Sequence, residues 1–347
     1  MYFLLWIITA IVIGYTRYGF RAIGESRYVL QFFSFFVPFY LIKKHRLHDT
    51  EFITHLIQKT MYLAALAGVA AYFYGNAFDL GWEDFRGERY ISTFQTFNIV
   101  IFTCYLLLKY EFQKKLSRQE TLLLILFALI AILSKNRASL VAPTAILLVI
   151  YALHGRLRAL AYATLIVVVL LVCIQFVSEP LWKQLLISFR GVVNPTVDES
   201  VNWRRGIQLV ALAQSMETFW LGQGYGGYFN FHVPGFNWDL PIEYPPHNQF
   251  LVLLLKTGII GATLCILTLA SYILKNYNLV RCLRINAKER LYLMALLVVI
   301  ASQLLYGFAY DFIPLYGLYY GYGIVLMRSI INAAKSRSMN QLEENKA

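Results

Sequence analysis

The sequence predicts an all-α, polytopic membrane protein, and three observations support this prediction. Of the 347 residues, 59% are hydrophobic and 14% are charged, whereas ordinary soluble domains carry about a quarter charged residues. Apolar runs suited to membrane-spanning helices recur along the chain. The connections between these runs alternate between basic-rich and basic-poor. This composition excludes a soluble enzyme or a nucleic-acid-binding protein, because so little polar surface could not cover a soluble fold of this size.

Ten membrane spans are expected, since a spanning helix needs roughly 20 mostly apolar residues and flanking residues complete the shorter runs. The expected spans are 2–16, 28–42, 60–74, 93–108, 121–134, 138–153, 159–177, 258–274, 290–306 and 312–328. The first run lacks a basic flank and a small-residue cleavage site, so we interpret it as a retained helix. Residues 122–153 could form one long helix. However, basic residues flank both ends, so we expect two crossings with an outer turn at 134–137.

The basic residues set the orientation, because they favour the cytoplasmic side. Five connections that fall on one face hold 19 of the 31 Lys and Arg residues: 43–59, 109–120, 154–158, 275–290 and 328–347. Both termini are therefore expected in the cytoplasm. The formal net charge of +12 then faces anionic lipid heads, and no nucleic acid is needed to explain it.

The expected organisation has four parts. They are an N-terminal bundle of about seven spans (1–177), an external loop subdomain (178–257), a C-terminal bundle of about three spans (258–328) and a cytoplasmic tail (329–347). The loop is too polar to span and too long for a simple connector, so we expect it to be ordered and functional. Its residues 203–219 have apolar side chains at helical spacing, which predicts an amphipathic helix at the membrane surface with Asn202 as its N-cap.

Candidate binding residues lie in this loop. Arg204 and Arg205 offer forked donors suited to phosphate oxygens, although anchoring to lipid phosphates would use the same pair. Gly222-Gln-Gly224 lacks the strand and the Lys-Ser/Thr of a nucleotide loop, so a tight backbone turn is expected. Aromatic faces suit sugar rings, although an interfacial aromatic belt would look the same. The aromatic candidates are Trp203, Tyr225 and Trp238.

The loop ends at a histidine placed for proton transfer. A helix is expected to start at His247 or Asn248, directly after two prolines. The positive end of a helix dipole favours a neutral imidazole, which can accept a proton. The alternative is that His247 only caps its helix. No external cysteine nucleophile and no zinc-type spacing of His and Cys are present in the sequence, so neither a metal nor another cofactor is expected.

In their order along the chain, these motifs resemble the O-antigen ligase and Wzy-type O-antigen polymerase family of bacterial membrane proteins. The first motif is SKNRAS, with Arg137 at the arginine position of a turn between two spans. The second is Arg204 followed by the turn at Gly222 and Gly224. The third is His247-Asn248 followed by Gly258 and Gly261. Gln208, Phe219 and Lys256 stand where the family often has Trp, Pro and Glu, and the chain has fewer spans than many members.

The resemblance implies a metal-independent glycosyltransferase of GT-C-like architecture, with its active site on the periplasmic face of the bacterial inner membrane. It implies a glycan donor on undecaprenyl diphosphate and, as acceptor, another lipid-linked glycan (polymerase) or lipid A-core (ligase). A chain-length regulator and membrane lipids are further implied partners. His247 is then the catalytic base. Arg137, Arg204 and Arg205 bind the diphosphate, while Asn248, Gly222, Gly224 and the three aromatic residues bind substrate.

Two other classes remain open from the sequence. Asp79, Glu83 and Asp84 lie in an external connection, where they could bind a divalent cation in a metal-dependent glycosyltransferase of the GT-C type. A polysaccharide transporter is the other class. Proton- or sodium-coupled transport usually needs acidic residues within spans, and none lies in the middle of an expected span here.

Overall fold

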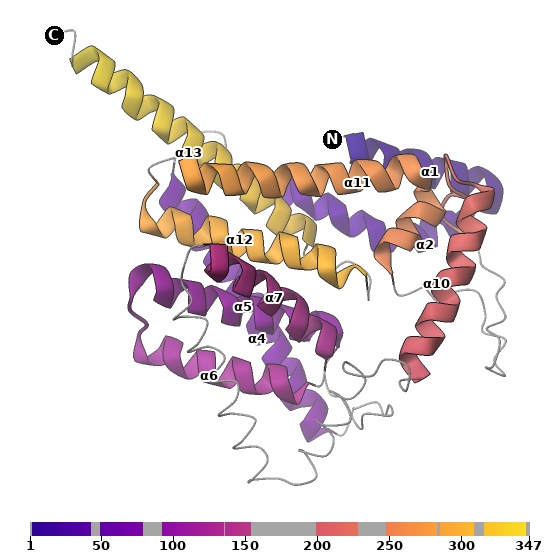
Figure 1. The fold of residues 1–347 in the computed structure, drawn as a ribbon, viewed down its shortest axis with the longest axis horizontal. Coiled ribbons are helices and arrows are strands. Elements are labelled where there is room, and N and C mark those ends of the chain that lie inside the picture. Colours follow the sequence, from indigo (N-terminus) through magenta and orange to yellow (C-terminus); the bar gives the residue numbers. More distant parts are fainter. Residues whose placement is uncertain are drawn as a thin grey trace.

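The chain is all-helical in the computed structural model, which describes residues 2–42, 49–78, 92–134, 136–153, 199–227, 248–282, 285–308 and 316–344 (Figure 1). No strand occurs among these residues, so the predicted all-α class is confirmed for them. The elements are α1 (Tyr2–Tyr18), α2 (Phe20–Leu30), η1 (Gln31–Phe35), α3 (Phe36–Leu41), α4 (Thr50–Ala77), α5 (Thr93–Gln113), α6 (Arg118–Leu133), α7 (Arg137–Leu153), α10 (Glu199–Glu217), α11 (Gln249–Cys282), α12 (Ala287–Tyr306) and α13 (Tyr316–Glu344).

Three of the described helices are long and apolar enough to cross a membrane, namely α4, α11 and α12. Tyr2–Tyr18 and Ala138–Leu153 are shorter apolar helices. The ten-span count therefore stays a prediction, and the expected span 159–177 lies outside the described residues. In the expected span 28–42, the end of α2, η1 and α3 follow one another without a gap up to Leu41, so the stretch is helical and its crossing of the membrane stays a prediction.

Helix starts are set by polar side chains that bond the first free backbone N–H groups. Ser92, Ser117 and Asn286 form capping boxes at the starts of α5, α6 and α12, and Asp49 caps α4. These caps place the start of α4 within the expected connection 43–59, so the helix is longer than its apolar run.

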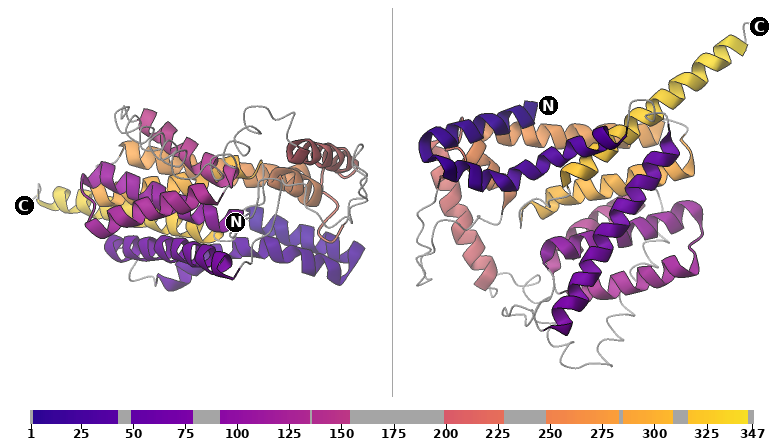
Figure 2. Two further views of the ribbon diagram at one scale, coloured as in Figure 1. Left: turned by 90° about the horizontal axis from the view of Figure 1, so that it is seen from below. Right: turned by 180° about the vertical axis from the view of Figure 1, so that it is seen from behind.

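The helices pack as a bundle in which α12 is central, contacting α4, α5, α7, α11 and α13 (Figure 2). Of its membrane-spanning window, 78% is buried. Aromatic side chains join the layers: the Tyr105 and Tyr292 hydroxyls are 3.2 Å apart, and the Phe97 ring meets Tyr306 edge-on. The core is therefore formed between helices distant in sequence.

Contacts at the helix ends agree with alternating crossings. At one end, Lys288 pairs with Glu51 at 2.9 Å and Lys109 pairs with Glu120; all four lie in connections expected in the cytoplasm. At the other end, the Gln249 N–H donates to the Gly307 carbonyl at 2.7 Å. There too, the Asn136 amide nitrogen donates to the Thr96 hydroxyl at 2.8 Å. Helix ends that the basic residues assign to the same face of the membrane therefore contact one another.

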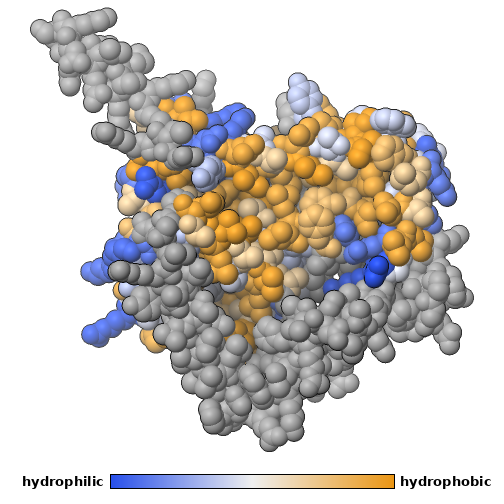
Figure 3. Space-filling model, viewed as in Figure 1, coloured by the Kyte–Doolittle hydropathy of each residue, from blue (hydrophilic) through white to orange (hydrophobic). Residues whose placement is uncertain are grey.

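The outside of the bundle is strongly apolar. Figure 3 shows a continuous hydrophobic face over the region of α11 and α12. On α11, Ile266, Leu267 and Leu274 are exposed. Such a face is larger than soluble proteins normally leave in water, and it suits the hydrocarbon region of a bilayer.

Glycines permit close helix packing around α13. A Cβ atom added at Gly321 would lie 2.4 Å from the Phe35 carbonyl oxygen, and one at Gly323 would lie 1.8 Å from the Tyr272 hydroxyl. The small residues of α13 therefore let η1 and α11 approach its backbone.

Candidate functional site

The predicted tight turn forms directly after α10, at residues 222–227. Gly222, Gly224 and Gly226 have φ angles of 73°, 83° and 90°, in the left-handed region that favours glycine. The Gly222 N–H donates to Thr218 at 2.8 Å and the Gly224 N–H donates to Lys256 at 3.0 Å. Both N–H groups are therefore used within the protein, and the role of these two glycines in binding substrate stays a prediction.

The turn is built into a break in α11. At Gly258 the backbone takes φ 65° and ψ −176°, which interrupts the helix. A break leaves backbone groups without helical partners, and these must be satisfied elsewhere. Three hydrogen bonds to the turn do so: Gln223 N–H to the Leu255 carbonyl at 2.8 Å, Gly224 N–H to the Lys256 carbonyl, and Ile259 N–H to the Phe219 carbonyl at 2.8 Å.

Two glycine motifs that are separate in sequence therefore meet in space. A Cβ atom at Gly222 would lie 2.5 Å from the Gly258 nitrogen. A Cβ atom at Gly258 would lie 2.2 Å from the Trp220 carbonyl oxygen. At these distances no larger residue fits without moving the backbone.

Helix α1 is the third component of this junction, and the sequence analysis gave it no role. The Trp6 indole donates to the Thr257 carbonyl at 2.8 Å, and the Tyr225 N–H is 3.4 Å from the Ala10 carbonyl. Gly14 lies against the turn, since a Cβ atom there would be 2.0 Å from the Tyr225 carbonyl oxygen. Small residues four apart, Ala10 and Gly14, were the available signal for this close approach.

A buried ion pair joins α2 to the same junction. The Lys256 side chain is only 3% exposed, and its ammonium lies 2.7 Å from a Glu25 carboxylate oxygen. It also donates to the Gly227 carbonyl at 2.6 Å, while the Gly226 N–H donates to Glu25. The lysine that departs from the family pattern is thus neutralised by a carboxylate from the N-terminal part of the chain.

The start of α11 lies where the sequence placed it. The Asn248 side-chain oxygen accepts from the N–H groups of Phe250 at 3.1 Å and Leu251 at 3.2 Å, so Asn248 is the N-cap. His247 comes immediately before it and lies outside the described residues. Since Asn248 occupies the capping position, the alternative role of His247 as the cap loses its basis.

Helix α10 separates the two loop arginines. It starts at Glu199, so the expectation that Asn202 is its N-cap is wrong. Its buried residues Ile207, Ala211 and Ser215 face α11, against which the helix packs, and the half-buried Arg204 lies on this side. Arg205 is exposed, on the side of the exposed Leu209, Leu212 and Met216.

In the expected outer turn at 134–137, the described residues Ser134 and Asn136 are buried. Asn136 is 1% exposed, and the Ser139 hydroxyl donates to the Thr93 carbonyl at 2.6 Å. This bond and the Asn136–Thr96 hydrogen bond fix the turn to the start of α5. Arg137 is the first residue of α7, and its side chain lies outside the described part of the structure.

The remaining expected site residues have mixed outcomes. Tyr225 is 2% exposed, so its ring packs inside the junction and offers no face to a sugar, contrary to our interpretation. Trp238 and the Trp203 side chain lie outside the described residues, as do Asp79, Glu83 and Asp84 of the alternative metal site. Within the described residues, no group of three or more His, Cys, Asp or Glu side chains could hold a metal ion.

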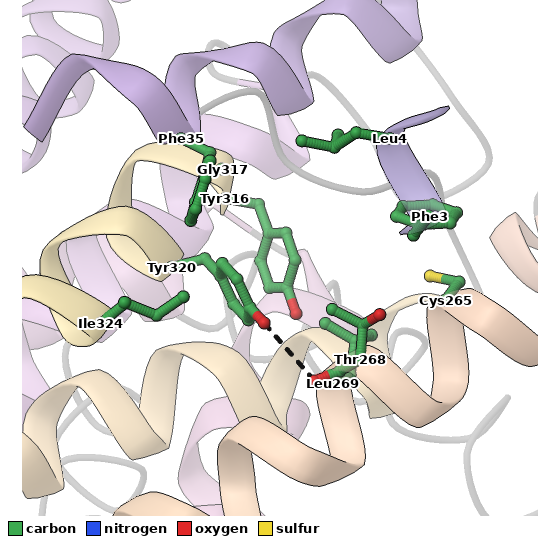
Figure 4. A pocket seen from close by; sticks show the side chains of 10 residues that line it. All are labelled: Phe3, Leu4, Phe35, Cys265, Thr268, Leu269, Tyr316, Gly317, Tyr320 and Ile324. Atoms are coloured by element: carbon green, nitrogen blue, oxygen red, sulfur yellow. Dashed lines mark hydrogen bonds between the residues drawn. The ribbon is translucent and has the colours of Figure 1, made fainter. Parts of the chain in front are cut away.

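A separate cavity of about 100 Å³ lies between α1, η1, α11 and α13 (Figure 4). Its lining includes Phe3, Leu269, Ile324 and Tyr320, whose hydroxyl lies 3.5 Å from the Thr268 carbonyl. This lining is mainly apolar, so it suits hydrocarbon and not a sugar or phosphate.

The comparison with protein families agrees with the motifs. Residues 122–266 match the family model described as O-antigen ligase. No curated protein matches the sequence. The matched segment contains the turn at 134–137, α10, the glycine turn, and the start and break of α11. The match over residues 122–266 therefore supports the resemblance to the O-antigen ligase family that the motifs indicate.

Proposed function

We propose that the protein is a membrane glycosyltransferase that moves a glycan from undecaprenyl diphosphate to an acceptor sugar hydroxyl, on the periplasmic face of the bacterial inner membrane. One observation carries this proposal beyond the family match. Helix α10, which bears Arg204, packs against α11, whose N-cap directly follows His247. The arginine-bearing helix thus packs against the helix that follows the proposed base in sequence.

The proposed reaction is a displacement at the anomeric carbon of the donor. The acceptor oxygen forms a bond to this carbon, the carbon–oxygen bond to the diphosphate breaks, and undecaprenyl diphosphate leaves. His247 takes the acceptor proton, and general-base help of this kind typically gives 10²–10⁴-fold in rate. Arg137 and Arg204 stabilise the charge on the leaving diphosphate, with Arg205 as a further candidate. Direct displacement inverts the anomeric configuration.

Polymerisation is the favoured form of this transfer, and ligation to lipid A-core is the alternative. The favoured form rests on the departures from the family pattern at Gln208, Phe219 and Lys256. Because the arginine and histidine positions supply all the required chemistry, we expect transfer to survive EDTA. Loss of transfer in EDTA, restored by a divalent cation, would instead support the metal-dependent alternative.

The test uses a strain that lacks this gene, complemented with wild type, His247→Ala or His232→Ala. His232 is the matched control, because it is the other histidine expected outside. We expect His232→Ala to restore a normal lipopolysaccharide ladder. We expect His247→Ala, present in the membrane at wild-type amount, to leave either core with a single repeat (polymerase) or bare core with polymer on the lipid carrier (ligase). A normal ladder with His247→Ala would reject the proposed base.

A further inference from the structure

We infer that Glu25 and Lys256 are positioning residues for the transfer site, and that the α1–α2 hairpin is a working part of that site although it lies outside the family-matched segment. This inference rests on the proposed function, because it names residues that hold the same site in place. The hairpin turns at Gly19, where φ is 63°, and α2 brings Glu25 back towards the glycine turn.

The contacts of Lys256 show that it holds the structure and does not bind substrate. An ammonium group has three N–H donors. The Lys256 ammonium lies 2.7 Å and 3.0 Å from the two Glu25 oxygens and 2.6 Å from the Gly227 carbonyl. These three acceptors use its donor capacity, so the cation is bound entirely within the protein.

Glu25 bridges both sides of the junction. Its carboxylate accepts from the Lys256 ammonium on α11 and from the Gly226 N–H in the glycine turn. The pair therefore fixes three segments together: α2, the turn that leads into 228–247, and the first part of α11. That first part begins at the N-cap Asn248, so the pair fixes the helix start that directly follows the proposed base in sequence.

Loss of the Glu25–Lys256 ion pair is expected to move the segments that it joins. The Lys256 ammonium is buried, whereas Glu25 is 35% exposed. A buried charge that loses its partner is strongly unfavourable, so Lys256 cannot lose Glu25 without movement of the segments around it. A shift of about 1 Å in a reacting group can reduce a rate about 10²-fold. Loss of the pair should therefore lower kcat, whereas KM for the donor, which the arginines bind, should change little.

The experiment compares purified full-length variants in nanodiscs, supplied with the lipid-linked glycan extracted from the deletion strain. The variants are Lys256→Met, Glu25→Gln and the swapped pair Glu25→Lys/Lys256→Glu. The matched control is Lys288→Met, which removes the lysine of the exposed Lys288–Glu51 pair at the opposite end of the bundle. We expect Lys256→Met to lose about 100-fold in kcat, Glu25→Gln to lose less, and Lys288→Met to equal wild type.

The swapped pair gives the sharpest result. The swap restores opposite charges, but it puts a carboxylate against the Gly227 carbonyl and an ammonium against the Gly226 N–H. If the pair acts by holding the turn, the swap stays as inactive as Lys256→Met. Full recovery by the swap would show that charge balance alone matters, and would overturn the positioning role.

Hydrogen exchange of the peptide 219–227 provides a readout independent of activity. We expect the amides of this turn to exchange faster in Lys256→Met than in wild type or Lys288→Met, with the remaining helices unchanged. If Lys256→Met shows the exchange rates and the kcat of wild type, the positioning role is rejected. If His247→Ala is inactive in the same assay, the proposed function still stands. If wild type itself transfers no glycan, the proposed function fails, and faster exchange would then still show that the pair holds the turn.

Discussion

At Gly258 the backbone adopts a conformation that side-chain-bearing residues rarely take, and the site depends on it. The residue turns the first part of α11 away from the rest of the helix, and the freed backbone groups bind the glycine turn. A Cβ atom added at Gly258 would lie 2.2 Å from the Trp220 carbonyl oxygen. Both conformational strain and lack of space therefore require glycine here.

We predict that Gly258→Ala disrupts the junction. The strained backbone alone costs about 1–3 kcal/mol, and the clash with Trp220 adds to it. The unfolding temperature in detergent should fall by several degrees, and glycan transfer should be lost.

Gly24→Ala is the control for Gly258→Ala, because an added Cβ atom there meets nothing within 4 Å and the residue lies in a helix. It should be neutral or stabilising by up to about 1 kcal/mol. Equal behaviour of the two variants would contradict the importance of the break.

At the residue scale, the sequence predicted what depends on local pattern. The glycine turn and the start of α11 at Asn248 follow from residues close in the chain. The Glu25–Lys256 pair joins residues 231 positions apart, so no local pattern could identify the partner. Burial of Tyr225 was missed for a similar reason, since its surroundings come from α1.

At the element scale, helical periodicity decides the roles of neighbouring residues. Arg204 and Arg205 are adjacent in sequence, yet α10 points them to different sides. The side with Arg204 packs against α11, and the side with Arg205 also exposes Leu209, Leu212 and Met216. Arg204 is therefore the better candidate for the diphosphate, and Arg205 suits lipid phosphates.

We predict that Arg204→Ala lowers transfer far more than Arg205→Ala. Removal of a group that stabilises developing charge typically costs about 10²–10³-fold in kcat, and we expect a loss of this size for Arg204→Ala. Arg205→Ala should retain transfer within a few-fold. The measurement is initial rate in nanodiscs with extracted lipid-linked glycan. The reverse order of effects would assign the diphosphate to the other side of the helix.

The start of α6 predicts a dependence of stability on pH. Burial opposes ionisation of Glu120, but hydrogen bonds from Lys109 and Ser117 outweigh it and lower the pKa of the carboxyl below its ordinary value. A lowered pKa means that the ionised carboxylate stabilises the fold above the unfolded-state pKa, about 4.3, and that this contribution disappears as pH falls through the folded-state pKa.

We therefore expect Glu120→Gln to unfold at a lower temperature than wild type at pH 7, with the difference closing towards about pH 3. Lys109→Met removes the partner and should behave similarly. Thermal unfolding in detergent at several pH values measures this. A difference between wild type and Glu120→Gln that stayed constant down to low pH would exclude Glu120 as its source.

For the whole molecule, the amino-acid composition and the placement of charges were more informative than helical periodicity. Low charge and apolar runs identified a helical membrane protein, and the placement of basic residues predicted which helix ends meet. The bend in α11 was not foreseen, because it depends on Gly258, whose close backbone neighbours Trp220 and Gly222 lie in another segment. The family match covers residues 122–266, and α1 and α2 contact this segment from outside it.

The orientation of the whole chain gives the last prediction. Basic-rich connections should remain in the cytoplasm, so the glycine turn and the α1–α2 hairpin should face outward. Gly24 and Lys115 are both exposed and are expected on opposite sides of the membrane. Of the four native cysteines, Cys104 and Cys265 are buried, and Cys173 and Cys282 are replaced by Ser for this test. In intact spheroplasts, a membrane-impermeant maleimide should label Gly24→Cys, and should label Lys115→Cys only after permeabilisation. The reverse pattern would place the site in the cytoplasm, where a periplasmic glycan transfer could not occur.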